Sequence, residues 1–153
     1  SYWIERLLRL FIRPTEIEMI IERSALVQGI GLYLLLYGIH VGVLPWLVGE
    51  SAANSDNQAA LYLLNQALGI TTCLLPGYMA ARKAGHHGFI HGGLVGGVST
   101  ILTALIAMLW AVITGARFSG LATIPFWILT NAFLAAFAGI MATNLKETSG
   151  PET

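Results

Sequence analysis

The charged residues of this chain leave four long apolar segments between them. The stretches without Asp, Glu, Lys or Arg are 24–49, 57–81, 84–116 and 118–145. Each is long enough to cross a bilayer, which takes about 20 apolar residues. Because the backbone finds no water to bond in lipid, segments that cross it must be helices. Allowing end errors of about two to four residues, the pattern predicts spans at 25–48, 58–81, 89–114 and 121–144.

The segment 1–23, ahead of the first span, has an amphipathic pattern. Apolar residues recur at helical spacing up to Arg13, and the arginines between them are directed elsewhere. This pattern is typical of a helix lying in the membrane interface, and Pro14 ends it. The expected interfacial anchors are Trp3, Arg6, Arg9 and Arg13. The sequence therefore predicts an all-α protein: an N-terminal amphipathic interfacial helix, a membrane four-helix bundle over 24–146, and a polar tail over 147–153.

The basic residues are distributed unevenly between the two ends of the predicted spans. Arg117 alone lies in the loops on one side. The other seven flank the spans on the opposite side: Arg6, Arg9, Arg13, Arg23, Arg82, Lys83 and Lys146. Since positive residues favour the cytoplasm, we expect both termini to be cytoplasmic in a multi-pass protein of a bacterial inner membrane.

Composition agrees with lipid as the main surrounding of the chain. Hydrophobic residues make up 56% and charged residues 10%, against roughly a quarter charged in soluble domains. The formal net charge is zero, so no basic field favours a nucleic-acid partner. The single Cys73 excludes an internal disulfide, and we interpret it as a small buried apolar residue.

One segment carries a family resemblance. Gly77-Tyr78-Met79-Ala80-Ala81-Arg82-Lys83-Ala84-Gly85 is followed by Phe89-Ile90-His91-Gly92-Gly93-Leu94-Val95-Gly96-Gly97. This resembles an uncharacterised family of small four-span bacterial membrane proteins, in which a Gly-x-x-Ala-Ala-Arg turn leads into a His-Gly-x-x-x-Gly helix start. The resemblance implies a four-helix membrane protein and no particular activity. The N-terminal extension and the Asn-rich loop after the first span depart from that pattern.

Glycines dominate one face of the third predicted span and part of the first. Small residues let helix backbones approach closely in lipid. The face serves either packing within the bundle or contact with another subunit. The candidate packing residues are Gly38, Gly42, Gly88, Gly92, Gly93, Gly96 and Gly97.

Polar residues occur inside the apolar spans. With a rise of 1.5 Å per residue and the orientation above, they fall in the outer half of the membrane. They form either a small polar site or ion path, or a set of interhelical hydrogen bonds worth about 0.6 kcal/mol each. The members of this predicted polar layer are His40, Asn65, Gln66, Thr103 and Asn131.

The remaining histidines do not predict a metal site. His87 and His91 share a helix face, with His86 beside them, but no Cys, Asp or Glu is near, and a structural zinc site takes four ligands. We expect interfacial polar residues there, with no metal or other cofactor. No nucleophile motif, phosphate-binding loop or paired carboxylate is present in the sequence, so the chain is not expected to be an enzyme.

Two functions follow as hypotheses. The first is a non-catalytic accessory, scaffold or assembly subunit that packs through its glycine faces into a homo-oligomer or larger membrane complex. The alternative is a small oligomeric transporter or channel component that uses the polar layer around His40.

Overall fold

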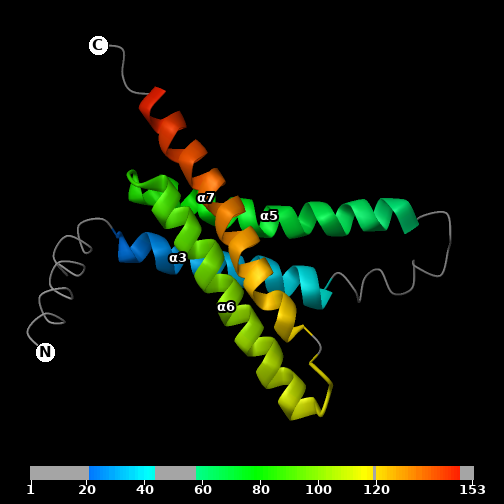
Figure 1. The fold of residues 1–153 in the computed structure, drawn as a ribbon. Helices are drawn as coiled ribbons and strands as arrows, with labels where there is room; N and C mark the ends of the chain where they lie inside the picture. Colours follow the sequence, from blue (N-terminus) through cyan, green and yellow to red (C-terminus); the bar gives the residue numbers. More distant parts are fainter. Residues whose placement is uncertain (1–20, 44–57, 119, 149–153) are drawn as a thin grey trace, which may run out of the picture.

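The computed structural model describes residues 21–43, 58–118 and 120–148, and nearly all of these residues lie in helices. The helices are α3 (Arg23–Gly38), continued by the π-helical stretch η1 (Ile39–Val43), α5 (Gln58–Ala84), α6 (Gly88–Thr114), the short 3-10 turn η4 (Leu121–Thr123) and α7 (Ile124–Thr148) (Figure 1). The predicted interfacial helix falls almost entirely outside the described residues, as do Trp3, Arg6, Arg9 and Arg13.

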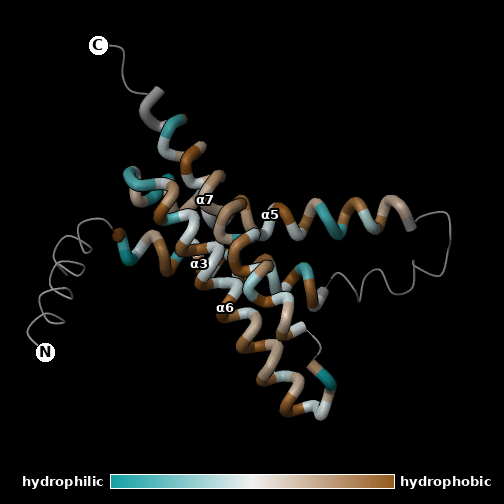
Figure 2. Tube along the Cα trace, viewed as in Figure 1, coloured by the Kyte–Doolittle hydropathy of each residue, from teal (hydrophilic) through white to brown (hydrophobic). Residues whose placement is uncertain are grey.

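Among the described residues, four helices are long and apolar enough to cross a membrane, which confirms the predicted all-α, four-span fold. They cover Arg23–Gly42, Ala59–Ala84, Gly88–Thr114 and Leu121–Leu145. Their outward surfaces are hydrophobic along most of their length (Figure 2), with Val112 79% and Leu129 73% exposed. Apolar surface on that scale needs a non-aqueous surrounding. The chain is therefore a multi-pass membrane protein.

The helices are arranged as two pairs that cross. Helices α3 and α5 lie side by side as one pair, and α6 and α7 form the other (Figure 1). Helix α7 packs on both α5 and α6. Helices α5 and α6 meet at their connecting turn and diverge away from it (Figure 1). The bundle is therefore closed at the end with the α5–α6 turn and splayed at the end with the α6–α7 loop.

The α5–α6 turn reverses the chain within three residues. Gly85 has φ 74° and donates its N–H to the Ala81 carbonyl over 2.9 Å, the usual left-handed end of a helix. His87 precedes α6 with φ 47°, a conformation uncommon for residues other than glycine. The exposed His86 donates from Nδ1 to the Ala84 carbonyl over 2.8 Å.

A seam of small residues joins α6 to α7. A Cβ added to Gly92 would overlap the carbonyl oxygen of Ala135, and one added to Gly96 would overlap that of Asn131. Gly88 meets the backbone of Gly139 in the same way. In this seam the two backbones touch directly, as glycine faces in lipid allow.

The other predicted packing glycines differ in their surroundings. Gly93 and Gly97 face α7 across ordinary distances, because an added Cβ would lie 3.6 Å from the nearest Cβ on that helix. An added Cβ at Gly38 or Gly42 would meet no described atom within 4 Å. Within the described residues, the α6 glycines thus pack inside the bundle, whereas Gly38 of α3 and Gly42 of η1 face away from it.

A fully buried histidine ties the start of α3 to the start of α6. His91 accepts a hydrogen bond at Nε2 from the Glu22 backbone N–H, over 2.9 Å. Its Nδ1 donates to the His87 carbonyl over 3.1 Å. A neutral imidazole has one donor and one acceptor nitrogen, so these two bonds use both.

Candidate functional site

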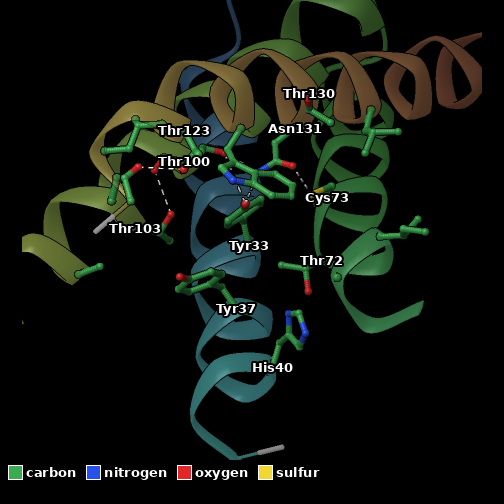
Figure 3. Close-up of a pocket in the computed structure, with 18 of the residues that line it drawn as sticks. Tyr33, Tyr37, His40, Thr72, Cys73, Thr100, Thr103, Thr123, Thr130 and Asn131 are labelled. Atoms are coloured by element: carbon green, nitrogen blue, oxygen red, sulfur yellow. Dashed lines mark hydrogen bonds between the residues drawn. The ribbon is translucent and has the colours of Figure 1, made fainter. Parts of the chain in front are cut away.

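Asn131 of α7 connects all four helices near the middle of the bundle. Its Nδ2 donates to the Thr100 hydroxyl of α6 over 3.0 Å and to the Tyr33 hydroxyl of α3 over 3.3 Å. The Cys73 thiol of α5 donates to Asn131 Oδ1 over 3.3 Å (Figure 3). We call these four residues the central node. Both amide protons of Asn131 are used, so the node has little hydrogen-bonding capacity left for a ligand.

A cavity of about 520 Å³ lies beside the central node. Figure 3 shows its side chains projecting from α3, α5, α6 and the α7 segment toward a common space. The lining continues from the node toward the α6–α7 loop and includes Phe118 and Gly120 of that loop. The cavity therefore occupies the splayed half of the bundle. Its other walls include Tyr37, His40, Asn65, Gln66, Thr103 and Trp127.

His40 and Asn65 pair across the cavity wall. The His40 Nε2 and Asn65 Oδ1 atoms are 2.8 Å apart; a carboxamide oxygen can only accept, so Nε2 donates. His40 lies in the π-helical stretch, a helix form often found at functional sites. Gly69 makes room for the ring, because an added Cβ there would lie 3.3 Å from His40 Cε1.

The threonines of the cavity wall present acceptors. Thr72 donates its hydroxyl proton to the Leu68 carbonyl over 2.8 Å. Thr103 donates to the Thr100 carbonyl over 3.0 Å, and Thr123 does the same toward Gly120 over 2.9 Å. A hydroxyl whose proton is engaged keeps lone pairs that can accept. These three threonine hydroxyls thus favour a ligand that donates a hydrogen bond.

The lining, within the described ranges, contains no Asp, Glu, Lys or Arg. Arg82 and Lys83 are at the opposite end of α5, beside the α5–α6 turn. Arg117 is exposed and precedes Phe118, which does line the cavity. The cavity therefore provides hydrogen bonds without a formal countercharge.

The five residues of the predicted polar layer all line this cavity, in separate groups. His40 pairs with Asn65, Asn131 belongs to the node, and Thr103 bonds within its own helix. Gln66 makes no hydrogen bond to another described side chain, although it is part of the wall. The predicted polar layer is therefore not one cluster. His40 and Asn65 form a pair near the edge of the cavity, whereas Asn131 belongs to the buried central node.

Sequence reasoning missed three of the four node residues: Tyr33, Cys73 and Thr100. A signal was present in the first span, where Tyr33, Tyr37 and His40 recur at intervals of four and three residues and so share one helix face. Cys73 is buried, as its interpretation required, but its thiol also donates a hydrogen bond.

The histidines of the α5–α6 turn are close together. The ring centroids of His86 and His91 are 5.5 Å apart, and those of His86 and His87 are 5.1 Å apart. Both nitrogens of His91 are occupied by backbone partners. In the part of the chain that the structure describes, no three His, Cys, Asp or Glu side chains are arranged to hold a metal ion.

Comparison of the chain with protein-family models, with curated proteins and with solved structures gives no match. Fold and site are therefore described from this chain alone. They identify a multi-pass, all-α membrane protein of four packed helices, with a cavity between the helices in its splayed half.

Proposed function

We propose that the protein is a non-catalytic membrane binding protein that holds a small molecule in the cavity between its four helices. The observation that carries the proposal is the cavity of about 520 Å³ with polar side chains from every helix. Small-molecule sites are concave, mostly apolar, and fall between roughly 300 and 1,000 Å³, with a few polar groups that orient the ligand. Helix bundles commonly place such sites between their helices.

The absence of an acid–base pair from the described lining supports binding without chemical conversion. The Cys73 thiol donates to an amide oxygen rather than to a base. His40 bonds to Asn65 and has no described carboxylate or nucleophile beside it. Covalent and acid–base catalysis both need such neighbours.

The tight seam at the other end supports a site with one entrance. Gly77 and Gly92 both pack against the backbone of Ala135. A transporter or channel component built around His40, which was the alternative from sequence, would have to open this seam to form a continuous path. Binding needs no such opening, so it is the simpler function for this geometry.

The test measures binding to the protein in lipid nanodiscs by ¹⁹F NMR. Four matched probes are used: 4-fluorobenzyl alcohol, its methyl ether, 4-fluorobenzoate and 4-fluorobenzylammonium. Ala107→Trp, on the cavity wall, fills the site. Val112→Trp adds the same side chain to the same helix at a position that is 79% exposed, and so controls for the substitution and for partitioning into lipid.

We expect at least one probe to bind saturably to the wild type and to Val112→Trp, and to lose that binding in Ala107→Trp. Circular dichroism of all three proteins checks that each keeps its helices. If no probe distinguishes the wild type from a folded Ala107→Trp, the cavity is not a binding site and the proposal is wrong.

A second candidate is the assembly subunit that the sequence also favoured. Its support is the outward face of α3 and η1, where Gly31, Gly38 and Gly42 have no described neighbour within 4 Å of an added Cβ. These glycines recur at intervals of seven and four and therefore share a face. If a homo-oligomer forms there, Gly38→Leu should shift the species on native gels to a smaller size, whereas Val112→Leu, at an exposed position of α6, should not. An unchanged size for Gly38→Leu would remove this face as the interface.

The finer points of identity and placement are part of the proposal. The distribution of basic residues supports cytoplasmic termini in a bacterial inner membrane, with the cavity then in the outer half. The four long apolar helices agree with membership of the small four-span family that the segment from Gly77 to Gly97 resembles.

A further inference from the structure

The cavity lining limits the charge of what it can hold. No carboxylate, ammonium or guanidinium group is present among its described residues. An ion moved from water into a low-dielectric site without a partner loses solvation that nothing replaces. Arg117 is the nearest charged residue along the described chain, but it is exposed and outside the lining. An uncharged ligand fits this environment better than an anion or a cation.

The His40–Asn65 pair offers a donor and an acceptor side by side. Because His40 Nε2 donates to Asn65 Oδ1, the neutral ring keeps Nδ1 as an acceptor. The Asn65 Nδ2 amide has no partner among the described residues, so its two protons remain available. A group that both donates and accepts satisfies this pair, whereas a group that only accepts satisfies half of it.

The threonine walls add a preference for donors. Thr72, Thr103 and Thr123 have given their protons to backbone carbonyls and can only accept from a ligand. The apolar remainder of the lining, which includes Ile70, Trp127 and Leu134, suits a hydrocarbon body. A hydroxyl on such a body supplies the donor, the acceptor and the apolar contact together.

We propose that the ligand of this cavity is an uncharged small molecule with a hydroxyl group, which the His40–Asn65 pair and the wall threonines recognise. This inference rests on the proposed binding function and specifies the ligand class of the same site. The central node takes no direct part, because its amide protons are engaged within the bundle.

The four fluorinated probes test the ligand class directly, because they share one ring and differ in charge and hydrogen bonding. The alcohol donates and accepts, the ether only accepts, and the other two are ions. We expect the alcohol to bind at least about tenfold more tightly than either ion, since desolvating an unpaired charge costs more than one hydrogen bond. Over the ether we expect about threefold to tenfold, the effect of one net hydrogen bond.

Two variants locate the recognition. His40→Phe keeps an aromatic ring but removes the acceptor, and Asn65→Leu keeps the shape but removes the donors. His40→Phe should reduce the preference for alcohol over ether to below about twofold, as expected when the alcohol loses the acceptor for its proton. Asn65→Leu removes donors from which both probes accept, so it should weaken alcohol and ether alike, by about threefold to tenfold, and leave the preference in place. His86→Phe, an exposed histidine at the α5–α6 turn, is the matched control and should keep the preference.

The outcomes distinguish a wrong ligand class from a wrong binding function. Tighter binding of an ion, or equal binding of ether and alcohol to the wild type, would overturn the ligand class while leaving the cavity a binding site. A preference that survives in folded His40→Phe, or undiminished binding of both alcohol and ether to folded Asn65→Leu, would overturn the role of the pair. If every probe binds the wild type and folded Ala107→Trp equally, the proposed binding function itself is wrong.

Discussion

His91 of α6 accepts a hydrogen bond through Nε2 from the backbone N–H of Glu22, over 2.9 Å, directly before α3 begins. The first N–H groups of a helix have no partner within the helix and need one from elsewhere. Here the partner comes from a side chain 69 positions later in the chain. The contact fixes where α3 starts relative to the α5–α6 turn.

Replacing His91 with phenylalanine should therefore destabilise the bundle. The variant keeps a ring of similar size but leaves the Glu22 N–H without its acceptor, and it removes the donor to the His87 carbonyl. Leaving a buried backbone group unpaired costs about 1–3 kcal/mol, and these two groups are partly buried, so we expect a loss toward the lower end of that range. Reversible unfolding in mixed detergent micelles measures the change. His86→Phe, at an exposed position of the same turn, should cost much less, and equal losses for the two variants would contradict a special role for His91.

Gly92→Ala should also destabilise the protein, for a steric reason. The new Cβ would overlap the Ala135 carbonyl oxygen and lie 2.9 Å from the Ala136 Cα atom. These are backbone atoms, so α6 and α7 must move apart, and overpacking of this kind costs about 1–3 kcal/mol. The free energy of unfolding, measured as above, reports the effect.

The neighbouring Gly93 is the control for this substitution. An added Cβ there would lie 3.6 Å from the Ala136 Cβ, at ordinary contact distance. Gly93→Ala should leave stability unchanged, or raise it by up to about 1 kcal/mol through helix propensity. If both alanine variants are equally stable, the seam is not set by close backbone contact.

The spans and the glycine seam could be predicted from the sequence to a greater extent than the central node. The spans were predictable because hydropathy and missing charge depend only on composition along the chain, and they agree with the helices to within a few residues at the ends the structure describes. The α6 glycines were predictable as a packing face because their spacing of four is a helical repeat. Which helix they would contact was not, because small residues recur at helical spacing in more than one other span, at Gly38 and Gly42 of the first and at Ala135, Ala138 and Ala142 of the fourth.

The node was harder to predict because tyrosine, threonine and cysteine are common in apolar helices whether or not they meet. Asn131 was noticed because an amide is costly in lipid, but its partners come from three other spans. His91 was interpreted as interfacial, since nothing local indicates that its ring would reach the amide of Glu22. Such pairings depend on how helices cross, which single-helix periodicity does not contain.

Asn131→Leu should destabilise the bundle through the node. Leucine preserves the volume but removes both donors and the acceptor, and hydrogen bonds within membranes contribute about 0.6 kcal/mol each. Three lost bonds then predict a loss of about 2 kcal/mol. The control is Thr130→Val. Thr130 precedes Asn131 in α7 and makes no hydrogen bond to a residue of the central node, so this variant should have a smaller effect.

A double-mutant cycle tests whether the node acts through the named contacts. Tyr33→Phe removes the hydroxyl that accepts from Asn131. If the contact contributes, the double variant should lose less than the sum of the single losses, by about 0.6 kcal/mol. Additive losses would mean that Tyr33 and Asn131 stabilise the bundle independently.

The last prediction concerns sidedness, which decides where a ligand would enter. If the basic residues orient the chain as proposed, the α6–α7 loop faces the outside and the α5–α6 turn faces the cytoplasm. Cys73→Ser removes the only cysteine and keeps a hydroxyl that can donate to Asn131. On that background, Ala116→Cys and His86→Cys place single thiols at exposed positions of the loop and the turn.

A membrane-impermeant maleimide added to intact spheroplasts should label Ala116→Cys, and should label His86→Cys only after the membrane is opened. The reversed pattern would place the cavity on the cytoplasmic side, and the ligand would then have to come from the cytoplasm. Because hydrogen bonds within the bundle are the same in either orientation, the reversal would leave the central node and the glycine seam as described. It would change only the compartment from which the His40–Asn65 pair could be reached.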